Sequence, residues 1–281
     1  MNVTADPHCS ICLDAGRMQL MDRALNLFKC ADCNHTITAF PEYDPDLYSE
    51  EYYSRAHKNW FAHPNFRLFS FIRKKLPSSD RPAKSKLLDV GCGNGDFLRY
   101  LAAETHSIEL YGVDTADCQV PGVRFTKGDF FEYRSSAKFD VVTNLTVIEH
   151  IENVRLFLQK IHDLLGDNGM LVTTTNNNDG LLYRIARVLK KIGMPAAYDR
   201  IYSSHHVQHF TNKSLRRLLE SSGFEVVSAK NHNYPLKAVD TPQAGFVTEK
   251  LYRLAVLLIF SVSSVFNNGF LQTFICRKKA S

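Results

Sequence analysis

The sequence predicts an α/β protein, in which helices cover a largely parallel β-sheet, with a small cysteine-rich module at its N-terminal end. An apolar run, a loop with three glycines and the start of a helix follow one another over residues 87–98. Further apolar segments alternate with helical patterns over residues 108–175, which is typical of parallel sheets. Two Cys-x2-Cys pairs precede these elements. These observations together predict one large domain and one small module.

The composition is that of a globular protein. The chain has 281 residues, of which 44% are hydrophobic and 22% charged, so it can bury one substantial core. Its net charge of +5 is mild and it has no long Lys/Arg block, so charge gives no indication of nucleic-acid binding. Residues 1–6 have neither a basic start nor an apolar run, and no signal peptide is therefore indicated. We expect a cytoplasmic protein.

Four cysteines have the spacing of a zinc site. They form two Cys-x2-Cys pairs with 17 residues between the pairs: Cys9, Cys12, Cys30 and Cys33. Two such turns offer four thiolates and complete a closed tetrahedral shell, so the zinc would be structural. A reducing cytosol disfavours disulfides here, and a redox motif would need only one pair. His8 and His35 are expected beside the metal rather than on it, and the other cysteines read as small buried residues.

These patterns divide the chain into three parts. Residues 1–42 form the zinc module, which is too small to fold without metal. Residues 43–83 form a helical cap and linker, with a helix from Asn59 to Leu76. Residues 84–281 form the main domain.

The loop at residues 91–95 predicts a nucleotide-sized ligand. Its three glycines remove Cβ atoms that would hold the backbone away from a ligand, and the following helix presents free N–H groups. The spacing is Gly-x-Gly-x-Gly, because Asp96 stands where a dinucleotide fingerprint would have its third glycine.

With Asp89 two residues before the first glycine, this segment resembles motif I of the class I S-adenosylmethionine-dependent methyltransferases. The resemblance implies a Rossmann-like seven-stranded sheet whose last strand is antiparallel, and S-adenosylmethionine as the cofactor. It places Asp114 on the ribose hydroxyls, Asp129 near the adenine amine and Phe130 over the adenine face. The full set of cofactor-binding residues that it implies is Asp89, Gly91, Cys92, Gly93, Gly95, Asp114, Asp129, Phe130 and Asn144.

Substrates of this family are usually recognised in an insertion after the fifth strand, here residues 176–210. A basic amphipathic helix is expected over 181–192, with Val188 and Ile192 on its apolar side. A histidine-rich segment then leads to Thr211, which would cap a helix over 212–222. The tyrosines at 43–53 resemble the cap that closes over the cofactor in small-molecule methyltransferases, and docking of the two domains explains them equally well.

The C-terminal region contains a stretch without charges, from Leu254 to Cys276. Its serines and asparagines argue against a membrane-spanning helix, and we predict a helix over 250–266 followed by a final strand over 270–276. Burial of this helix against the domain or in a homodimer is favoured. The alternative is peripheral contact of 181–192 and 250–266 with the inner face of a membrane.

Methyl transfer to a hydroxyl needs a base, and histidine has a suitable pKa. His150 follows the fourth strand, at the edge of the sheet where the methyl group should project, and His209 comes from the insertion. Both are candidate catalytic bases, with Glu149 beside the first. Some relatives bind a metal ion through Glu-x-x-Glu-His, but Thr146 replaces the first glutamate here, which argues against a catalytic metal.

The residues after Asn144 narrow the choice of acceptor. The Asn/Asp-Pro-Pro-Tyr/Phe motif of enzymes that methylate base or glutamine amines is absent there. The zinc module, the tyrosines and the histidine segment resemble those of bacterial methyltransferases of polysaccharide and natural-product pathways. We therefore predict O-methylation of a sugar, glycan or other small metabolite, without a nucleic-acid partner. The alternatives are an RNA methyltransferase, a sugar C-methyltransferase and a non-catalytic zinc-bearing scaffold.

Overall fold

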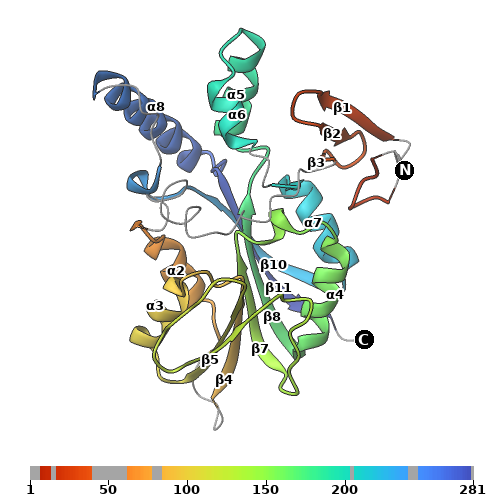
Figure 1. Ribbon diagram of the computed structural model, residues 1–281, viewed down its shortest axis with the longest axis vertical. Coiled ribbons are helices and arrows are strands. Elements are labelled where there is room, and N and C mark those ends of the chain that lie inside the picture. Colours follow the sequence, from red (N-terminus) through yellow and green to blue (C-terminus); the bar gives the residue numbers. More distant parts are fainter. Residues whose placement is uncertain are drawn as a thin grey trace.

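The computed structural model describes residues 7–13, 17–39, 62–77, 84–202, 206–239 and 246–279. The tyrosine-rich segment at 43–53 and His205 lie outside the described residues. Within the described part, a seven-stranded sheet runs through the centre of the molecule (Figure 1). Its strand order is β10-β11-β8-β7-β4-β5-β6. The strands are β4 (Ser85–Val90), β5 (Ile108–Asp114), β6 (Val123–Lys127), β7 (Phe139–Leu145), β8 (Leu165–Asn176), β10 (Phe224–His232) and β11 (Leu271–Lys278).

The pairing confirms the predicted Rossmann-like fold. The neighbours among β4, β5, β6, β7 and β8 pair in parallel, whereas β11 pairs antiparallel with both β8 and β10. The predicted turn at 166–169 is a bulge at the start of β8, because Phe139 pairs with Leu165 and Val141 with Met170. The parallel strands end at one edge, which is where such sheets bind ligands.

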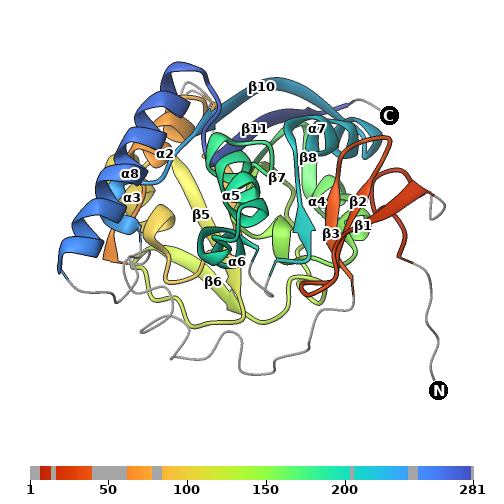
Figure 2. The same cartoon turned by 90° about the horizontal axis from the view of Figure 1, so that it is seen from above.

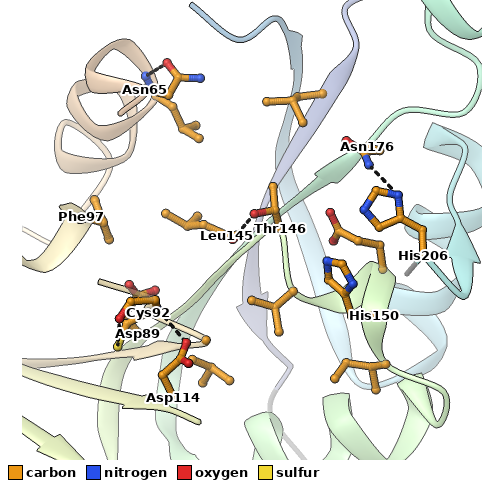
Figure 3. A pocket seen from close by; sticks show the side chains of 18 of the residues that line it. Asn65, Asp89, Cys92, Phe97, Asp114, Leu145, Thr146, His150, Asn176 and His206 are labelled. Carbon is orange, nitrogen blue, oxygen red and sulfur yellow. Dashed lines mark hydrogen bonds between the residues drawn. The ribbon is translucent and has the colours of Figure 1, made fainter. Parts of the chain in front are cut away.

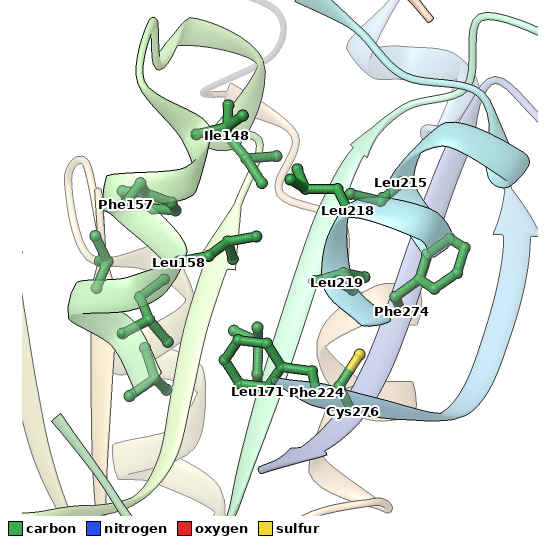
Figure 4. Packing of buried hydrophobic residues seen from close by; sticks show 14 of the residues in the cluster. Ile148, Phe157, Leu158, Leu171, Leu215, Leu218, Leu219, Phe224, Phe274 and Cys276 are labelled. Carbon is green, nitrogen blue, oxygen red and sulfur yellow. The ribbon is translucent and has the colours of Figure 1, made fainter. Parts of the chain in front are cut away.

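Two pairs of helices cover the sheet. One pair is α2 (Phe66–Arg73) with α3 (Asp96–Glu104), and the other is α4 (Val154–Leu164) with α7 (Asn212–Ser221). Figure 4 shows how apolar side chains of α4 and α7 meet over β8 and β11 in one core cluster. Thr211 caps α7 as predicted, and its side chain and that of Ser214 form a reciprocal capping box.

The cysteine-rich module has a four-stranded sheet of its own, in the order β1-β2-β3-β9. Its strands are β1 (Met18–Asp22), β2 (Leu27–Cys30), β3 (Thr36–Thr38) and β9 (Gln208–His209). The strand β9 belongs to the insertion of the main domain, so the module is completed by a segment from the other half of the chain. This pairing was not foreseen in the sequence.

The insertion and the C-terminal region contribute the helices above the sheet edge, α5 (Leu181–Lys191), α6 (Ala196–Ile201) and α8 (Phe246–Val265), with the short turns η3 (Ile148–His150) and η4 (Leu236–Ala238). The predicted basic amphipathic helix over 181–192 is present as α5, where Tyr183 and Ala186 are buried while Val188 and Ile192, on the predicted apolar side, are exposed. The expected burial of the C-terminal helix against the domain is wrong for most of its apolar side chains. Among the described residues, no helix is long and apolar enough to cross a membrane.

Candidate active site

A cleft of about 880 Å³ opens at the carboxyl edge of the parallel strands. Figure 3 shows Asp89, Cys92 and Asp114 at one end of it, and His150, His206 and Asn176 at the other, with Thr146 between them. The first group comes from β4, the glycine loop and β5, and the second from η3, β8 and the insertion.

The glycine loop is fixed by the carboxylate of Asp114. Its Oδ2 accepts a hydrogen bond of 2.7 Å from the backbone N–H of Gly93, and its Oδ1 accepts one of 2.8 Å from Ala116. Because β4 and β5 are in parallel register, the residue that ends β5 comes directly beside the loop that follows β4. The carboxylate therefore shapes the loop as well as lining the cleft.

The three loop glycines have different roles. A Cβ at Gly91 would lie 2.4 Å from Val147 Cγ2, and one at Gly95 would lie 2.5 Å from Cys118 Sγ. At Gly93, apart from its chain neighbours, no described atom lies within 4 Å of that position, and the residue lines the cleft. All three have positive φ, which favours glycine. Only Gly93 keeps space open for a ligand, whereas the other two allow close packing of the loop.

Asp89 is buried at the floor of the cleft, where its Oδ1 accepts a hydrogen bond of 2.6 Å from Thr143 Oγ1. Burial, together with the nearby carboxylate of Asp114, raises the pKa of this carboxyl to about 7, although the hydrogen bond from Thr143 lowers it. A cation placed in the cleft would favour its ionised form.

Most of the predicted cofactor residues reach this cleft. Its lining includes Asp89, Gly91, Cys92, Gly93, Asp114, Asp129 and Phe130. Gly95 and Asn144 are not part of that lining. The side chain of Asn144 is buried in the sheet, where its Oδ1 accepts a hydrogen bond of 2.6 Å from Thr173. Its predicted place beside the cofactor is thus wrong, because the side chain points to β8 rather than to the cleft.

The other end of the cleft carries two histidines and a carboxyl group. The rings of His150 and His206 lie 4.9 Å apart. Glu149 is buried beside them and accepts a hydrogen bond of 2.8 Å from Thr175 Oγ1, and burial raises its pKa to about 7. The three side chains have ligand atoms within 4.8 Å of one another, so they could share a proton or hold a metal ion. His206 was missed as a site residue because its approach depends on how the insertion folds back.

His209 does not join this group. It is buried at the border of the cysteine-rich module, with its Nε2 2.9 Å from Thr38 Oγ1 and its ring 5.0 Å from that of Tyr202. Burial lowers its pKa to about 3, so it stays neutral at physiological pH. The prediction of His209 as a base is therefore corrected to a structural role.

Thr146, which stands where some relatives have a metal-binding glutamate, is a strained residue of the cleft. Its φ is +61°, which is unfavourable for a β-branched side chain. The conformation is held by a hydrogen bond of 2.8 Å from its N–H to the carbonyl of Thr174. Strained residues cluster at functional sites, and this one redirects the chain between Leu145 and η3.

A sequence profile described as a methyltransferase domain matches residues 55–229. The chain belongs to this family. It is 31% identical over 166 residues to the ubiquinone biosynthesis O-methyltransferase of Ruegeria pomeroyi, which is 54% of this chain and 65% of the relative. With the protein of the same name from Rickettsia canadensis it shares 26% identity over 180 residues, 60% of this chain and 75% of that one. The methyltransferase thus spans less than two thirds of the first relative's length.

Solved structures agree with the fold. A protein of Thermotoga maritima, described as an S-adenosylmethionine-dependent methyltransferase and possible histamine N-methyltransferase, aligns with a TM-score of 0.53 at 16% identity. The alignment covers 83% of this methyltransferase and 100% of that protein. At this identity the likeness establishes the fold alone.

The methyltransferase has a second cluster of ligands in its N-terminal module. The Sγ atoms of Cys9 and Cys33 lie 3.6 Å apart, and those of Cys12 and Cys30 lie 3.9 Å apart. All four sulfur atoms lie within 4.8 Å of one another. Zinc–sulfur bonds of about 2.3 Å in a tetrahedron place the sulfurs about 3.8 Å apart, so the group fits one zinc ion. His35 lies beside the cluster and contacts Gln208 Oε1 instead, at 2.8 Å from its Nε2.

The upper wall of the cleft is apolar. Three residues of α8 form part of this wall: Tyr252, Val256 and Phe260. Other lining residues of this part are Leu182, Ile201, Tyr234, Phe270 and Leu271. Hydrophobic and aromatic walls with few polar groups are typical of sites for small organic ligands.

Proposed function

We propose that this methyltransferase transfers the methyl group of S-adenosylmethionine to a hydroxyl oxygen of a small acceptor. The observation that carries the proposal is the open backbone at Gly93, fixed by Asp114, in the same cleft as His150 and His206. The names of the curated relatives support O-methylation. The cofactor supplies an activated methyl group, and the chain must hold the acceptor oxygen in line with it.

The residues at the end of the cleft that carries the glycine loop fit a charged nucleoside. Gly93 offers bare backbone, and Asp114 offers a carboxylate for ribose hydroxyls. Asp129 and Phe130, which line the same end, would contact the adenine. The carboxylate of Asp89, at the floor of the cleft, would compensate the positive charge of the bound cofactor.

His150 is the proposed base that takes the proton of the acceptor hydroxyl. Glu149, buried directly beside it, would stabilise the imidazolium that forms, and His206 would pass the proton towards solvent. This arrangement replaces the pair of His150 and His209 that the sequence suggested.

The acceptor that fits the apolar wall is a hydroxylated aromatic or lipid-like molecule rather than a sugar or glycan. The test is incubation with labelled S-adenosylmethionine and three acceptor pools: hydroxylated aromatics, nucleotide sugars and total RNA. Label in the aromatic pool supports the proposal. Label in the sugar pool alone restores the acceptor class predicted from sequence, and label in RNA alone contradicts both.

We also propose that Cys9, Cys12, Cys30 and Cys33 hold one structural zinc ion. The four thiolates would close its coordination shell, so the metal would stabilise the module and take no part in methyl transfer.

Replacement of His150 by alanine is expected to lower kcat by about 10²–10⁴-fold, the usual contribution of a general base. The Kd of S-adenosylmethionine should change little, because His150 lies at the opposite end of the cleft from Gly93 and Asp114. Single-turnover kinetics and calorimetry measure the two quantities. The same substitution at His209 serves as the control and should leave the pH profile of kcat unchanged. Undiminished turnover in His150→Ala would reject the assignment.

Binding of S-adenosylmethionine is expected to strengthen by up to about tenfold as the pH rises from about 6 to about 8. The pKa of Asp89 is raised to about 7, so the carboxyl is mostly neutral below this pH and ionised above it. A positively charged ligand favours the ionised form, and binding at low pH must therefore release a proton. Calorimetry in buffers of different ionisation enthalpy detects that release. In Asp89→Asn, which keeps the oxygen facing Thr143, affinity should be weaker and should depend less on pH across this range, where Glu149 at the other end of the cleft keeps a pKa of about 7.

A further inference from the structure

The helix α8 exposes apolar side chains along most of its length. Leu254 is 52% exposed, Leu258 is 58% exposed and Val265 is 80% exposed. Among its described side chains, only Val256, Phe260 and Ser263 are buried. A soluble helix normally covers its apolar stripe, so this one presents a surface that needs a partner.

A second exposed apolar group lies on the neighbouring insertion. Val188 and Ile192, on and just after α5, and Met194 beyond them are each more than half exposed. In two perpendicular views, α5 and α8 project from the same end of the molecule, above the carboxyl edge of the sheet (Figures 1 and 2). We name these two groups together the apolar rim; its residues are Val188, Ile192, Met194, Leu251, Leu254, Leu257, Leu258, Val262, Val265 and Phe266.

The helices that carry the rim also carry basic side chains. The helices α5, α6 and α8 contain seven lysines and arginines and two acidic residues, Asp199 and Glu249. Both acidic groups are paired, with Lys190 and Arg253 respectively. The exposed basic residues of these helices are Arg184, Lys191, Arg200 and Lys250. A second copy would bring two positive surfaces together, whereas an anionic surface would complement them.

We propose that the apolar rim lies on an anionic lipid bilayer and that the acceptor enters the cleft from the membrane. Helices with exposed apolar faces and flanking lysines and arginines bind in the interface between head groups and acyl chains. The described helices are too short or too polar to span a bilayer, so the contact would be peripheral.

The rim leads directly to the candidate active site. The inner side of α8 lines the cleft through Tyr252, Val256 and Phe260. Arg200 of α6, one of the exposed basic residues, lines the cleft as well. An acceptor with a hydroxylated head and an apolar tail could place its head near His150 while the tail stays against α8. This part of the inference rests on the proposed function, whereas membrane binding itself does not.

The test is co-sedimentation of the full-length protein with vesicles of phosphatidylcholine, with and without phosphatidylglycerol, in the absence of cofactor and acceptor. We expect binding to the anionic vesicles that weakens with added salt. The double variant Leu254→Glu and Leu258→Glu should have an affinity for the anionic vesicles that is lower by about tenfold or more. Its Tm and its binding of S-adenosylmethionine should be unchanged. Val227→Glu, at an exposed apolar position on β10 outside the rim, is the matched control and should bind like the wild type.

Each of four outcomes would overturn the proposal. The first is that the wild type fails to sediment with anionic vesicles. The second is that Val227→Glu loses as much vesicle binding as the double variant. A wild-type dimer that the double variant converts to a monomer would assign the rim to a second copy. A marked fall in the Tm of the double variant, with no vesicle binding by the wild type, would assign the rim to a contact with another segment of this chain. Because no turnover is measured, failure of the proposed function leaves these results unaffected.

Discussion

Gly93→Leu is expected to leave the methyltransferase folded and to abolish its binding of S-adenosylmethionine. A leucine side chain at this position meets no described atom near its Cβ and would extend into the cleft. The φ of +54° costs an ordinary residue roughly 1–2 kcal/mol of folding free energy, which most domains tolerate. The cofactor would have to share its space with that side chain, so its Kd should rise about a hundredfold or more. Thermal unfolding and calorimetry with S-adenosylhomocysteine measure the two effects.

Gly95→Leu is the matched control, two residues further along the same loop. Its side chain would collide with Cys118 and Val120, at 2.5 and 2.6 Å from the Cβ. We therefore expect a loss of stability in this variant even without ligand, by several kcal/mol. Cofactor binding by Gly93→Leu at the wild-type affinity would show that the ligand does not approach the loop, and the proposed cofactor site would be withdrawn.

The cofactor end of the site was predictable because it is encoded locally. An apolar strand, a glycine loop and a helix start follow one another in the sequence, and the parallel register of β4 and β5 then brings Asp114 to Gly93. What each glycine does was not predictable. The neighbours that a Cβ would meet at Gly91 and Gly95 come from the chain between β7 and η3 and from the segment before β6.

The acceptor end was less predictable because it is assembled from distant segments. His206 lies beside His150 because the N–H of Val207 donates a hydrogen bond of 2.9 Å to the carbonyl of Glu149. The neighbouring strand β9 pairs with β3 of the cysteine-rich module, and two-residue pairings leave no recognisable sequence pattern. The same pairing places the side chain of His209 against Thr38, at the border of the cysteine-rich module and outside the lining of the cleft. The rings of His206 and His209 lie 6.4 Å apart, but only that of His206 is part of the cleft lining.

Which side of α5 is buried was not predictable for a related reason. Periodicity places its leucines and isoleucines on one apolar side, but Tyr183 packs inward against Tyr202 and Phe270. Arg187 turns inward as well, donating a hydrogen bond of 2.8 Å to the carbonyl of Asn178, and Lys190 pairs with Asp22 of β1. Pairing with buried polar partners outweighs the apolar stripe, which is left on the surface as part of the apolar rim.

Removal of zinc is expected to unfold the N-terminal module and to slow methyl transfer. Structural zinc contributes an apparent free energy of about 10–16 kcal/mol in small zinc-binding peptides, which exceeds what so small a core can supply. Cys33→Ser should therefore contain no zinc by atomic absorption and should be cleaved by protease within residues 7–39. Both measurements are independent of activity. Proteolytic resistance equal to that of the wild type would contradict a structural role for the metal.

The effect on methyl transfer follows from the contacts of Gln208. Its Oε1 accepts a hydrogen bond of 2.8 Å from Ser10 Oγ, between the first two cysteines, and its Nε2 donates bonds of 3.1 Å to the carbonyls of Ile151 and Glu152. These carbonyls directly follow His150, so the first cysteine turn is connected to the proposed base through one buried side chain. Gln208→Ala should keep its zinc and its affinity for S-adenosylmethionine, because the cofactor end of the cleft is built on β4 and β5, away from the module. It should nevertheless lose kcat, by about tenfold for a displaced base. Wild-type kcat in Gln208→Ala would show that the module is attached to the catalytic domain without positioning its site.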